Sequence, residues 1–265
     1  MTDEAVLLLG LAIALVAAWG LTSLWPIGPL IRTNHRGRHV PAVLGLAWAA
    51  GLTPAIGALE PGPALAGAAA AAALALAGLA DDLGPPGPRG FAGHLRGLAR
   101  GRPTTGILKL VVGVGGGVAV GLVAGGGAVR VAATAVLTAG SANVANALDV
   151  RPGRALKGAI LVLAAALPTL WGSAAGALAA AGLGAALAVL PLDLRERGML
   201  GDAGSNPLGF VAGLALALVL ATPWLVVAAA ASLALQVAAE TVTISRIIEV
   251  SPPLAWLDRL GRVRA

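Results

Sequence analysis

Two adjacent aspartates, Asp81 and Asp82, stand where a long apolar run ends, in the stretch LAGLADDLGPPGPRG. Because neighbouring residues on a helix point about 100° apart, the two carboxylates cannot share every partner. One could hold a metal ion while the other takes a proton or orients a ligand. The alternative is a solvated helix end, although acids at the C-terminal end of a helix are unfavourable for the helix dipole. The pair is therefore a candidate for acid–base or metal chemistry.

A second polar group lies in SANVANALDVRPGRALKG, residues 141–158. Asn143, Asn146 and Asp149 are spaced by three, so successive members are neighbours on a helix. Their amide and carboxylate groups could hydrogen-bond a sugar, a uracil or a metal-bound water. Arg154, with the basic residues around it, could bind phosphate. The alternative is a polar contact between helices followed by a positively charged loop.

Asp202 is flanked by Gly201 and Gly204 in MLGDAGSNPLGF, with Ser205 and Asn206 opening the next predicted helix. An aspartate held by glycines before a helix N-terminus suits Mg²⁺ bound next to a diphosphate. The alternative is a simple N-cap, which Ser205 or Asn206 could supply without Asp202.

Lys109 lies just inside an apolar segment, where a charge is a functional candidate by default. The stretch before it, RGFAGHLRGLARGR at 89–102, has the pattern of a short basic interfacial helix. This helix could steer a lipid phosphate toward the carboxylates, or simply anchor the chain to anionic lipid. Further along the segment, Gly113, Gly117 and Gly121 recur every four residues, which predicts close packing against another helix.

These side chains must be positioned by an unusually apolar chain. Of the 265 residues, 58% are hydrophobic and 11% are charged, with a mean hydropathy of +0.88. Soluble domains carry about 25% charged residues, so residues 1–265 are predicted to form a single integral membrane domain. The absence of cysteine excludes disulfides and thiolate metal sites. The net charge of +6 is attributed to membrane topology and anionic lipid, and no nucleic-acid partner is expected.

Apolar runs of membrane-spanning length predict an all-α fold of about nine transmembrane helices. Their approximate ranges are 5–25, 40–59, 64–80, 106–125, 128–147, 157–171, 174–192, 206–222 and 224–245. The first range is counted as a spanning helix because the N-terminus lacks the basic region of a secretory signal.

The distribution of basic residues predicts the orientation of these helices. With the N-terminus outside and the C-terminus inside, 16 of the 18 Lys and Arg residues fall in inner loops or the tail. This topology gathers five acids on the cytoplasmic side: Asp81, Asp82, Asp149, Asp193 and Asp202. We therefore expect a cytoplasmic active face in a multi-pass protein.

At these residues the sequence resembles the polyprenyl-phosphate N-acetylhexosamine-1-phosphate transferases, which include the phospho-N-acetylmuramoyl-pentapeptide and undecaprenyl-phosphate GlcNAc-1-phosphate transferases. LADDLG is similar to the family's Asp-Asp motif, NVANALDVRPG to its Asn-rich segment, and GDAGSNPLG to its Gly-Asp-x-Gly-Ser motif. TTGILK resembles the stretch that carries a functional lysine. The motifs occur in the family's order, and the resemblance spans roughly residues 30 to 250. The family's late His-rich motif is missing, because the corresponding region reads ISRIIEVSPPLAWLDRL.

The resemblance implies Mg²⁺-dependent transfer of a sugar-1-phosphate from a UDP-N-acetylhexosamine to undecaprenyl phosphate. UMP would be released, in cell-envelope glycan synthesis at the bacterial cytoplasmic membrane. It implies catalytic roles for Asp81, Asp82, Asp149 and Lys109, and Mg²⁺ ligation by Asp202 and Asn146. It implies substrate contacts for Asn143, Asn146, Arg154 and Ser205, and it allows a homodimer.

A different class of function remains open because the His-rich motif is missing. The chain would then be a catalytically degenerate member of the family that binds the lipid carrier. A transporter is disfavoured, because transporters tend to place polar groups near the bilayer midplane, whereas nearly all charges here lie at predicted helix ends.

Overall fold

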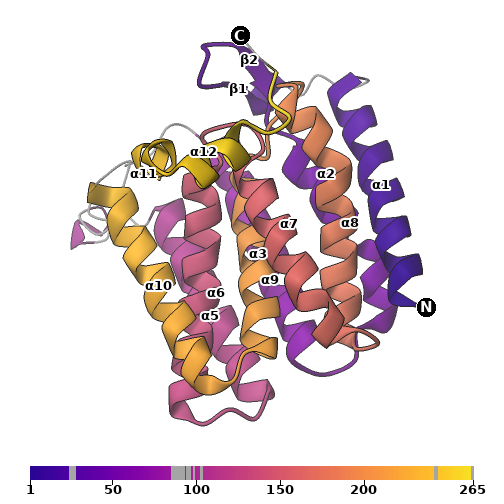
Figure 1. The fold of residues 1–265 in the computed structure, drawn as a ribbon, viewed down its shortest axis with the longest axis vertical. Helices are drawn as coiled ribbons and strands as arrows, with labels where there is room; N and C mark the ends of the chain where they lie inside the picture. The colour runs from indigo at the N-terminus through magenta and orange to yellow at the C-terminus, as the bar shows by residue number, and fades with distance from the viewer. Residues whose placement is uncertain are drawn as a thin grey trace.

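Long helices run side by side along one axis of the molecule in the computed structural model (Figure 1). The structure describes residues 1–23, 28–84, 93, 97, 99–101, 104–241 and 244–263. Within these ranges, seven helices are long and apolar enough to cross a membrane. They are α1 (Asp3–Ser23), α3 (Pro63–Leu83), α5 (Thr105–Val123), α6 (Ala128–Leu148), α8 (Ala174–Leu194), α9 (Asp202–Val219) and α10 (Thr222–Thr241).

Two of the nine predicted spans are shorter than these seven helices. The range 40–59 is divided into α2 (Leu44–Ala50) and a 3-10 helix, η2 (Thr53–Ala58), with Gly51 ending the first and a proline near the start of the second. The range 157–171 corresponds to α7 (Arg154–Leu170), which has 17 residues. Helix α9 begins four residues before the predicted start at 206, so the aspartate expected in a loop opens a helix instead.

A two-stranded antiparallel β-hairpin departs from the predicted all-α fold. After a short 3-10 helix, η1 (Gly28–Leu30), strand β1 (Ile31–Thr33) pairs with β2 (His39–Pro41). The Asn34 side chain closes the turn, because its Oδ1 accepts hydrogen bonds from the backbone N–H groups of Arg36 and Arg38, both at 2.9 Å. Such local bonds from asparagine to the backbone favour a turn over a helix.

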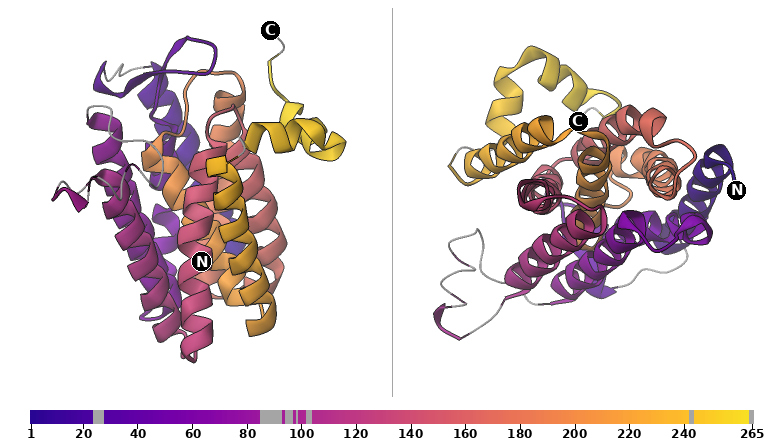
Figure 2. Two further views of the ribbon diagram at one scale, coloured as in Figure 1. Left: turned by 90° about the vertical axis from the view of Figure 1, so that its left-hand side faces the viewer. Right: turned by 90° about the horizontal axis from the view of Figure 1, so that it is seen from below.

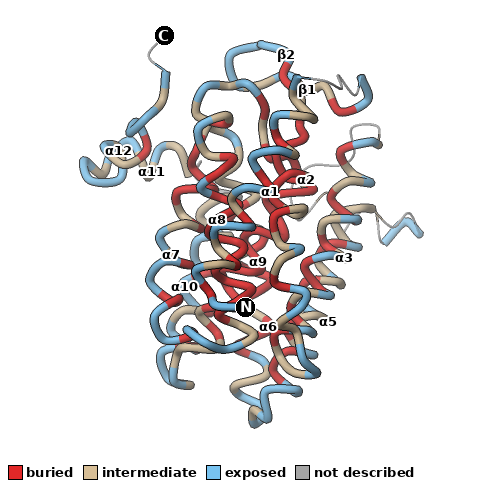
Figure 3. The backbone as a smooth tube through the Cα atoms, turned by 90° about the vertical axis from the view of Figure 1, so that its right-hand side faces the viewer, coloured by how far each residue is buried: buried red, intermediate tan, exposed pale blue. Residues whose placement is uncertain are grey.

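Helices α8 and α9 form the centre of the bundle, where buried positions dominate (Figure 3). Helix α1 packs along α8 so closely that a Cβ at Gly184 would lie 2.1 Å from the backbone oxygen of Leu7. The outer helices expose large apolar side chains, including Leu8 and Val16 on α1 and Val111 on α5. A helix that is apolar on all sides suits either a protein core or a lipid environment. Here the inner helices α8 and α9 form the core, and the outer helices present apolar surface that suits lipid.

The glycine stripe on α5 is a packing surface, as its spacing predicts. A Cβ at Gly117 would lie 2.3 Å from Thr138 Oγ1, and one at Gly121 would lie 2.8 Å from the Cα atom of Val131. Both neighbours belong to α6. The stripe therefore lets α5 and α6 approach closely, which fixes the position of Lys109 at the start of α5.

One end of the bundle carries the hairpin and two short C-terminal helices, α11 (Ile244–Val250) and α12 (Pro252–Arg259) (Figures 1 and 2). We call it the polar end. The last turn of α3 lies there against the first turn of α9, because the Asp82 side chain bonds to backbone groups of Asp202 and Ala203. The motifs singled out in the sequence stand at this end.

Candidate functional site

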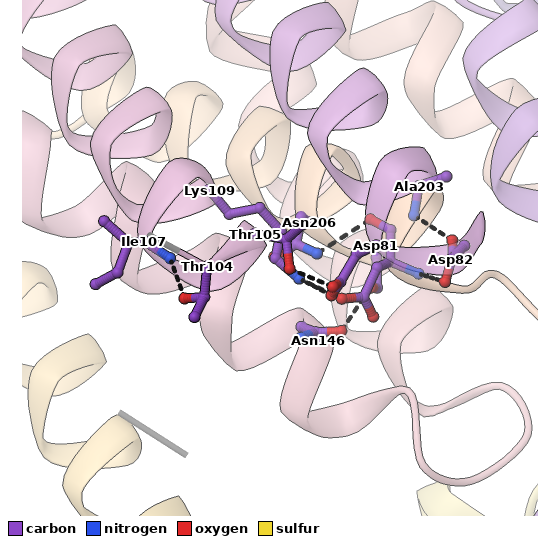
Figure 4. Close-up of polar contacts among 11 residues, drawn as sticks. Asp81, Asp82, Thr104, Thr105, Ile107, Lys109, Asn146, Ala203 and Asn206 are labelled. Atoms are coloured by element: carbon purple, nitrogen blue, oxygen red, sulfur yellow. Dashed lines mark hydrogen bonds and ion pairs between the residues drawn. The ribbon is translucent and has the colours of Figure 1, made fainter. Parts of the chain in front are cut away.

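Lys109 joins two aspartates from different helices, and Figure 4 shows it beside one of them, Asp81. Its Nζ lies 2.6 Å from Asp81 Oδ2 at the end of α3, and it also donates to Asp202 Oδ2 at the start of α9. Only 9% of the lysine side chain is exposed, so its charge depends on these partners. Thr105, one turn earlier on α5, donates its hydroxyl proton to Asp81 Oδ1. We call Asp81, Thr105, Lys109 and Asp202 the lysine cluster.

Asp82 has a different role from its neighbour Asp81. Its Oδ1 accepts the backbone N–H of Asp202 at 3.1 Å, and its Oδ2 accepts that of Ala203 at 2.9 Å. The carboxylate therefore caps the N-terminus of α9 from another helix, where a negative charge also favours the helix dipole. The two side chains point to different partners, as adjacent helix positions require. Asp81 is the member of the pair that faces Lys109.

Close backbone contacts explain the glycines on either side of Asp202. A Cβ at Gly78 on α3 would lie 2.2 Å from the backbone oxygen of Asp202, and one at Gly204 would lie 2.3 Å from the Cα atom of Gly45 on α2. Gly201 has φ 67° and ψ 179°, a conformation that is essentially restricted to glycine. These glycines therefore set where the first turn of α9, and with it Asp202, lies.

Asn146 links α6 to the same turn of α9, because its Oδ1 accepts a hydrogen bond of 2.9 Å from the hydroxyl of Ser205. Asn206 donates to the backbone oxygen of Asp202 at 3.0 Å. Neither Ser205 nor Asn206 therefore acts as the cap of α9, which corrects the alternative drawn from the sequence. The bond from Ser205 to Asn146 instead connects the Asn-rich motif to the Gly-Asp-x-Gly-Ser motif, and the bond of Asn206 stays within the first turn of α9.

Asp149 lies directly after α6 and is half-buried. Its burial raises the pKa of the carboxyl well above the ordinary value, and the negative charges of Asp193, Asp202 and Asp82 raise it further. The backbone N–H of Gly201 opposes the shift. Four acids from separate parts of the sequence thus influence one another at the polar end, which makes this region attractive to cations.

Two predicted substrate-binding residues, Arg154 and Asn143, bond to the C-terminal segment and to α10 and not to the first turn of α9. The Arg154 guanidinium is buried against the C-terminal segment, with Nε 2.6 Å from Asp258 Oδ1 and Nη1 2.7 Å from the hydroxyl of Ser245. Asn143 donates to Gln236 Oε1 on α10 at 3.2 Å, which is the polar contact between helices left open by the sequence. Most of the predicted interfacial helix at 89–102 falls outside the described residues.

The donors at the polar end fit Mg²⁺ only with help from a ligand. Among the described residues, no three His, Cys, Asp or Glu side chains are arranged to hold a metal ion by themselves. Mg²⁺ is commonly bound by one or two carboxylates together with substrate phosphates. Asp202 and Asn146 could supply the protein oxygens, and the contact of Lys109 with two carboxylates shows that positive charge is stable here.

Thr105 is the member of the lysine cluster that the sequence motifs did not single out. It lies four residues before Lys109, so the two share one face of α5. That spacing could have identified it as a partner of whatever Lys109 contacts.

The arrangement as a whole combines an ammonium, carboxylates and amide groups at one end of an apolar bundle. Charge neutralisation and positioning of this kind are what phosphoryl transfer requires. A scan against protein-family models and a search of the curated proteins found no match to the chain. The functional interpretation therefore depends on the short motifs and on their geometry.

Proposed function

We propose that this chain transfers a sugar-1-phosphate from a UDP-N-acetylhexosamine to undecaprenyl phosphate and releases UMP. It would act as a multi-pass protein of the bacterial cytoplasmic membrane, with the N-terminus outside and the polar end in the cytoplasm. The observation that carries the proposal is the contact of Lys109 with both Asp81 and Asp202. Three motifs that are separate in the sequence meet in this contact, because Asp81, Lys109 and Asp202 each come from a different one.

The chemistry of the reaction suits these side chains. An oxygen of the lipid phosphate attacks the sugar-bearing phosphorus of the donor, and the bond to UMP breaks. Asp81 would orient the lipid phosphate, and Lys109 would stabilise negative charge on the diphosphate. Mg²⁺, held by Asp202 and Asn146 together with substrate oxygens, would supply further charge neutralisation. Because the phosphate of a lipid carrier lies at the membrane surface, its partners must stand at helix ends, as Asp81 and Asp202 do.

One observation favours the second candidate, a protein that binds the lipid carrier without catalysis. The charges at the polar end are already compensated, because Lys109 pairs with two acids and Asp82 is occupied by two backbone N–H groups. Such a network could be purely structural. Binding of undecaprenyl phosphate without transfer is the property that distinguishes this candidate.

The deciding experiment measures UMP release by the purified protein in detergent, with undecaprenyl phosphate, Mg²⁺ and each candidate UDP-sugar. We expect release by the wild type, no release by Asp202→Asn, and full release by Glu60→Gln, a matched exposed acid remote from the polar end. If the folded wild type binds undecaprenyl phosphate but releases no UMP from any donor, the enzymatic proposal is wrong and the carrier-binding candidate replaces it.

A further inference from the structure

A cavity of about 750 Å³ opens at the polar end, outside the lysine cluster. Its walls come from the hairpin turn, the turn before α7 and the C-terminal segment. The basic and aromatic residues that line it are His35, Arg36, Arg151, Trp256, Arg259 and Arg262. Among the described residues of the lining, Glu196 is the single acid. A cavity of this size is large enough for a small organic ligand, and its charge favours an anion.

The described part of the lining contains four arginines, and two of them are free to bind such an anion. Arg36 is paired with Glu196 at 3.1 Å, and Arg262 bonds to Asp258 and to the backbone oxygen of Pro152. Within the described part of the chain, the guanidinium groups of Arg151 and Arg259 have neither a hydrogen bond nor an ion pair. Guanidinium groups bind phosphate oxygens with two parallel hydrogen bonds, so this pair is suited to a phosphate ligand.

The surroundings of His35 agree with a surplus of positive charge in the cavity. Burial lowers the pKa of His35, and the neighbouring Arg151 guanidinium lowers it further, with Glu196 opposing the shift. Burial is the larger cause of this shift, and the positive charge of Arg151, which would also attract an anion, acts in the same direction.

Trp256 adds an aromatic surface to the basic lining. It is 63% exposed although it belongs to the amphipathic helix α12, and Arg259 follows it by three residues on the same face. Indole rings bind planar bases by stacking, and base stacking beside a cation is a common mode of nucleotide recognition. A ligand that carries both a base and phosphates would use both features.

The C-terminal wall of the cavity is held in place by buried bonds. Asp258 of α12 pairs with Arg154, and Lys157 Nζ donates to the backbone oxygens of Leu257 and Asp258 at 2.8 and 2.9 Å. This contact gives Arg154 a positioning role in place of the phosphate contact expected from the sequence. Because the wall is already ordered, a ligand would not have to order it on binding.

A second cavity, of about 350 Å³, extends from the first toward the acids. It shares His35, Arg151, Pro152 and Glu196 with the larger cavity, and its lining includes Asp149 and Asp193. A phosphate chain bound at Arg151 would therefore point toward Asp149, whose carboxyl lies within the field of Asp202.

We infer that the Arg151–Arg259 cavity binds the nucleotide half of a soluble nucleoside-diphosphate substrate, with the base against Trp256 and the phosphates at Arg151. This inference rests on the proposed function for the identity of the donor. Anionic lipid headgroups offer the same phosphate chemistry without the base, and the experiment separates the two sources.

Binding of UDP is measured by calorimetry with the full chain in nanodiscs of zwitterionic phosphatidylcholine. Arg151→Gln and Arg259→Gln are each expected to weaken UDP binding roughly tenfold, about 1.4 kcal/mol, because each removes one charge-assisted contact. Trp256→Leu is expected to weaken UDP but not inorganic diphosphate. The matched control is Arg195→Gln, an exposed arginine that lines neither cavity.

Unchanged UDP affinity in a double Arg151→Gln, Arg259→Gln variant that unfolds at the wild-type temperature would overturn the inference. It would also be overturned if the double variant bound less phosphatidylglycerol than the wild type but kept its UDP affinity. The lipid headgroup, and not a nucleotide, would then be the ligand of the two arginines. If the proposed function is wrong but the cavity inference is right, the wild type would bind UDP through these arginines and release no UMP from any donor. If instead the proposed function is right and the cavity inference is wrong, Asp202→Asn would abolish UMP release and the double variant would bind UDP like wild type.

Discussion

Replacing Asp82 by asparagine tests whether the two adjacent aspartates have separate tasks. Asp82 is 8% exposed, and each of its oxygens accepts one backbone N–H from the first turn of α9. Asparagine keeps one acceptor oxygen, but its amide N–H₂ would face a second donor. One buried N–H group of α9 is then left without a partner.

The expected cost follows from these contacts. Leaving a buried N–H unsatisfied costs about 1–3 kcal/mol, and losing the charge at the helix N-terminus adds about 0.3–1 kcal/mol. Neutralising Asp82 also relieves its repulsion with Asp149, which offsets part of the loss. We therefore expect Asp82→Asn to destabilise the fold by ~2 kcal/mol, roughly a 30-fold shift in the unfolding equilibrium.

The matched variant is Asp81→Asn. Its remaining carbonyl oxygen can still accept the hydroxyl of Thr105, and Lys109 keeps its pairing with Asp202. We expect a stability change below ~1 kcal/mol, typical of breaking one contact in a partly exposed network, but a loss of UMP release. Stability is measured in detergent by thermal unfolding, with intrinsic tryptophan fluorescence as the signal, and activity by UMP release.

Equal unfolding temperatures for Asp82→Asn and wild type would refute the capping role. The division of tasks would also be wrong if Asp81→Asn unfolded at a lower temperature than Asp82→Asn. Thermal unfolding is informative here because a change of ~2 kcal/mol corresponds to a shift of about 4–8 °C for a domain of this size.

Two further predictions concern packing and pH. Gly204→Ala should lower the unfolding temperature, because the new Cβ would meet Gly45 at 2.3 Å and overpacking costs about 1–3 kcal/mol. The control is Gly20→Ala, which adds a Cβ to open space and should be neutral or stabilising. For Asp258, burial raises the pKa, but the hydrogen bond from Arg154 and the charge of Arg262 outweigh it and hold the pKa below the ordinary value. The attachment of α12 is therefore fully stable above about pH 4, the usual pKa of a free aspartate, and is lost as pH falls toward the lower folded value. Limited proteolysis of the C-terminal segment should show this release, and Asp258→Asn should show cleavage already at neutral pH. A wild-type tail that stays protected down to the lowest pH at which the bundle remains folded would count against it.

Several features of the candidate site could be predicted from the sequence because they are local. The apolar runs identify the long helices, and the four-residue spacing of Gly113, Gly117 and Gly121 identifies a packing face, which the contacts with α6 confirm. Lys109 stands out because a charge in an apolar run is costly without a partner. The helix breaks at 40–59 are harder to foresee, because a short 3-10 segment and a helix share the same apolar composition.

The partners of the polar side chains could not be predicted, because they belong to other helices. Nothing near Asp82 in the sequence indicates that it caps α9, since Ala203 lies 121 positions further along the chain. In the same way, the basic neighbours of Arg154 suggested phosphate binding, yet its charge is taken up by Asp258, 104 positions away.

The sequence by itself determined that this is an apolar, helical chain with a small set of acids, amides and basic residues at helix ends. Composition and periodicity are properties of residues that are close in the sequence, so they can be read without knowing how the helices pack. Only the tertiary structure decided which of these groups meet, which carboxylate faces Lys109 and which caps a helix, and that Arg151 and Arg259 line a cavity. These outcomes depend on the direction of side chains from helices that are distant in the sequence, and on glycines such as Gly78 and Gly204 that let those helices touch.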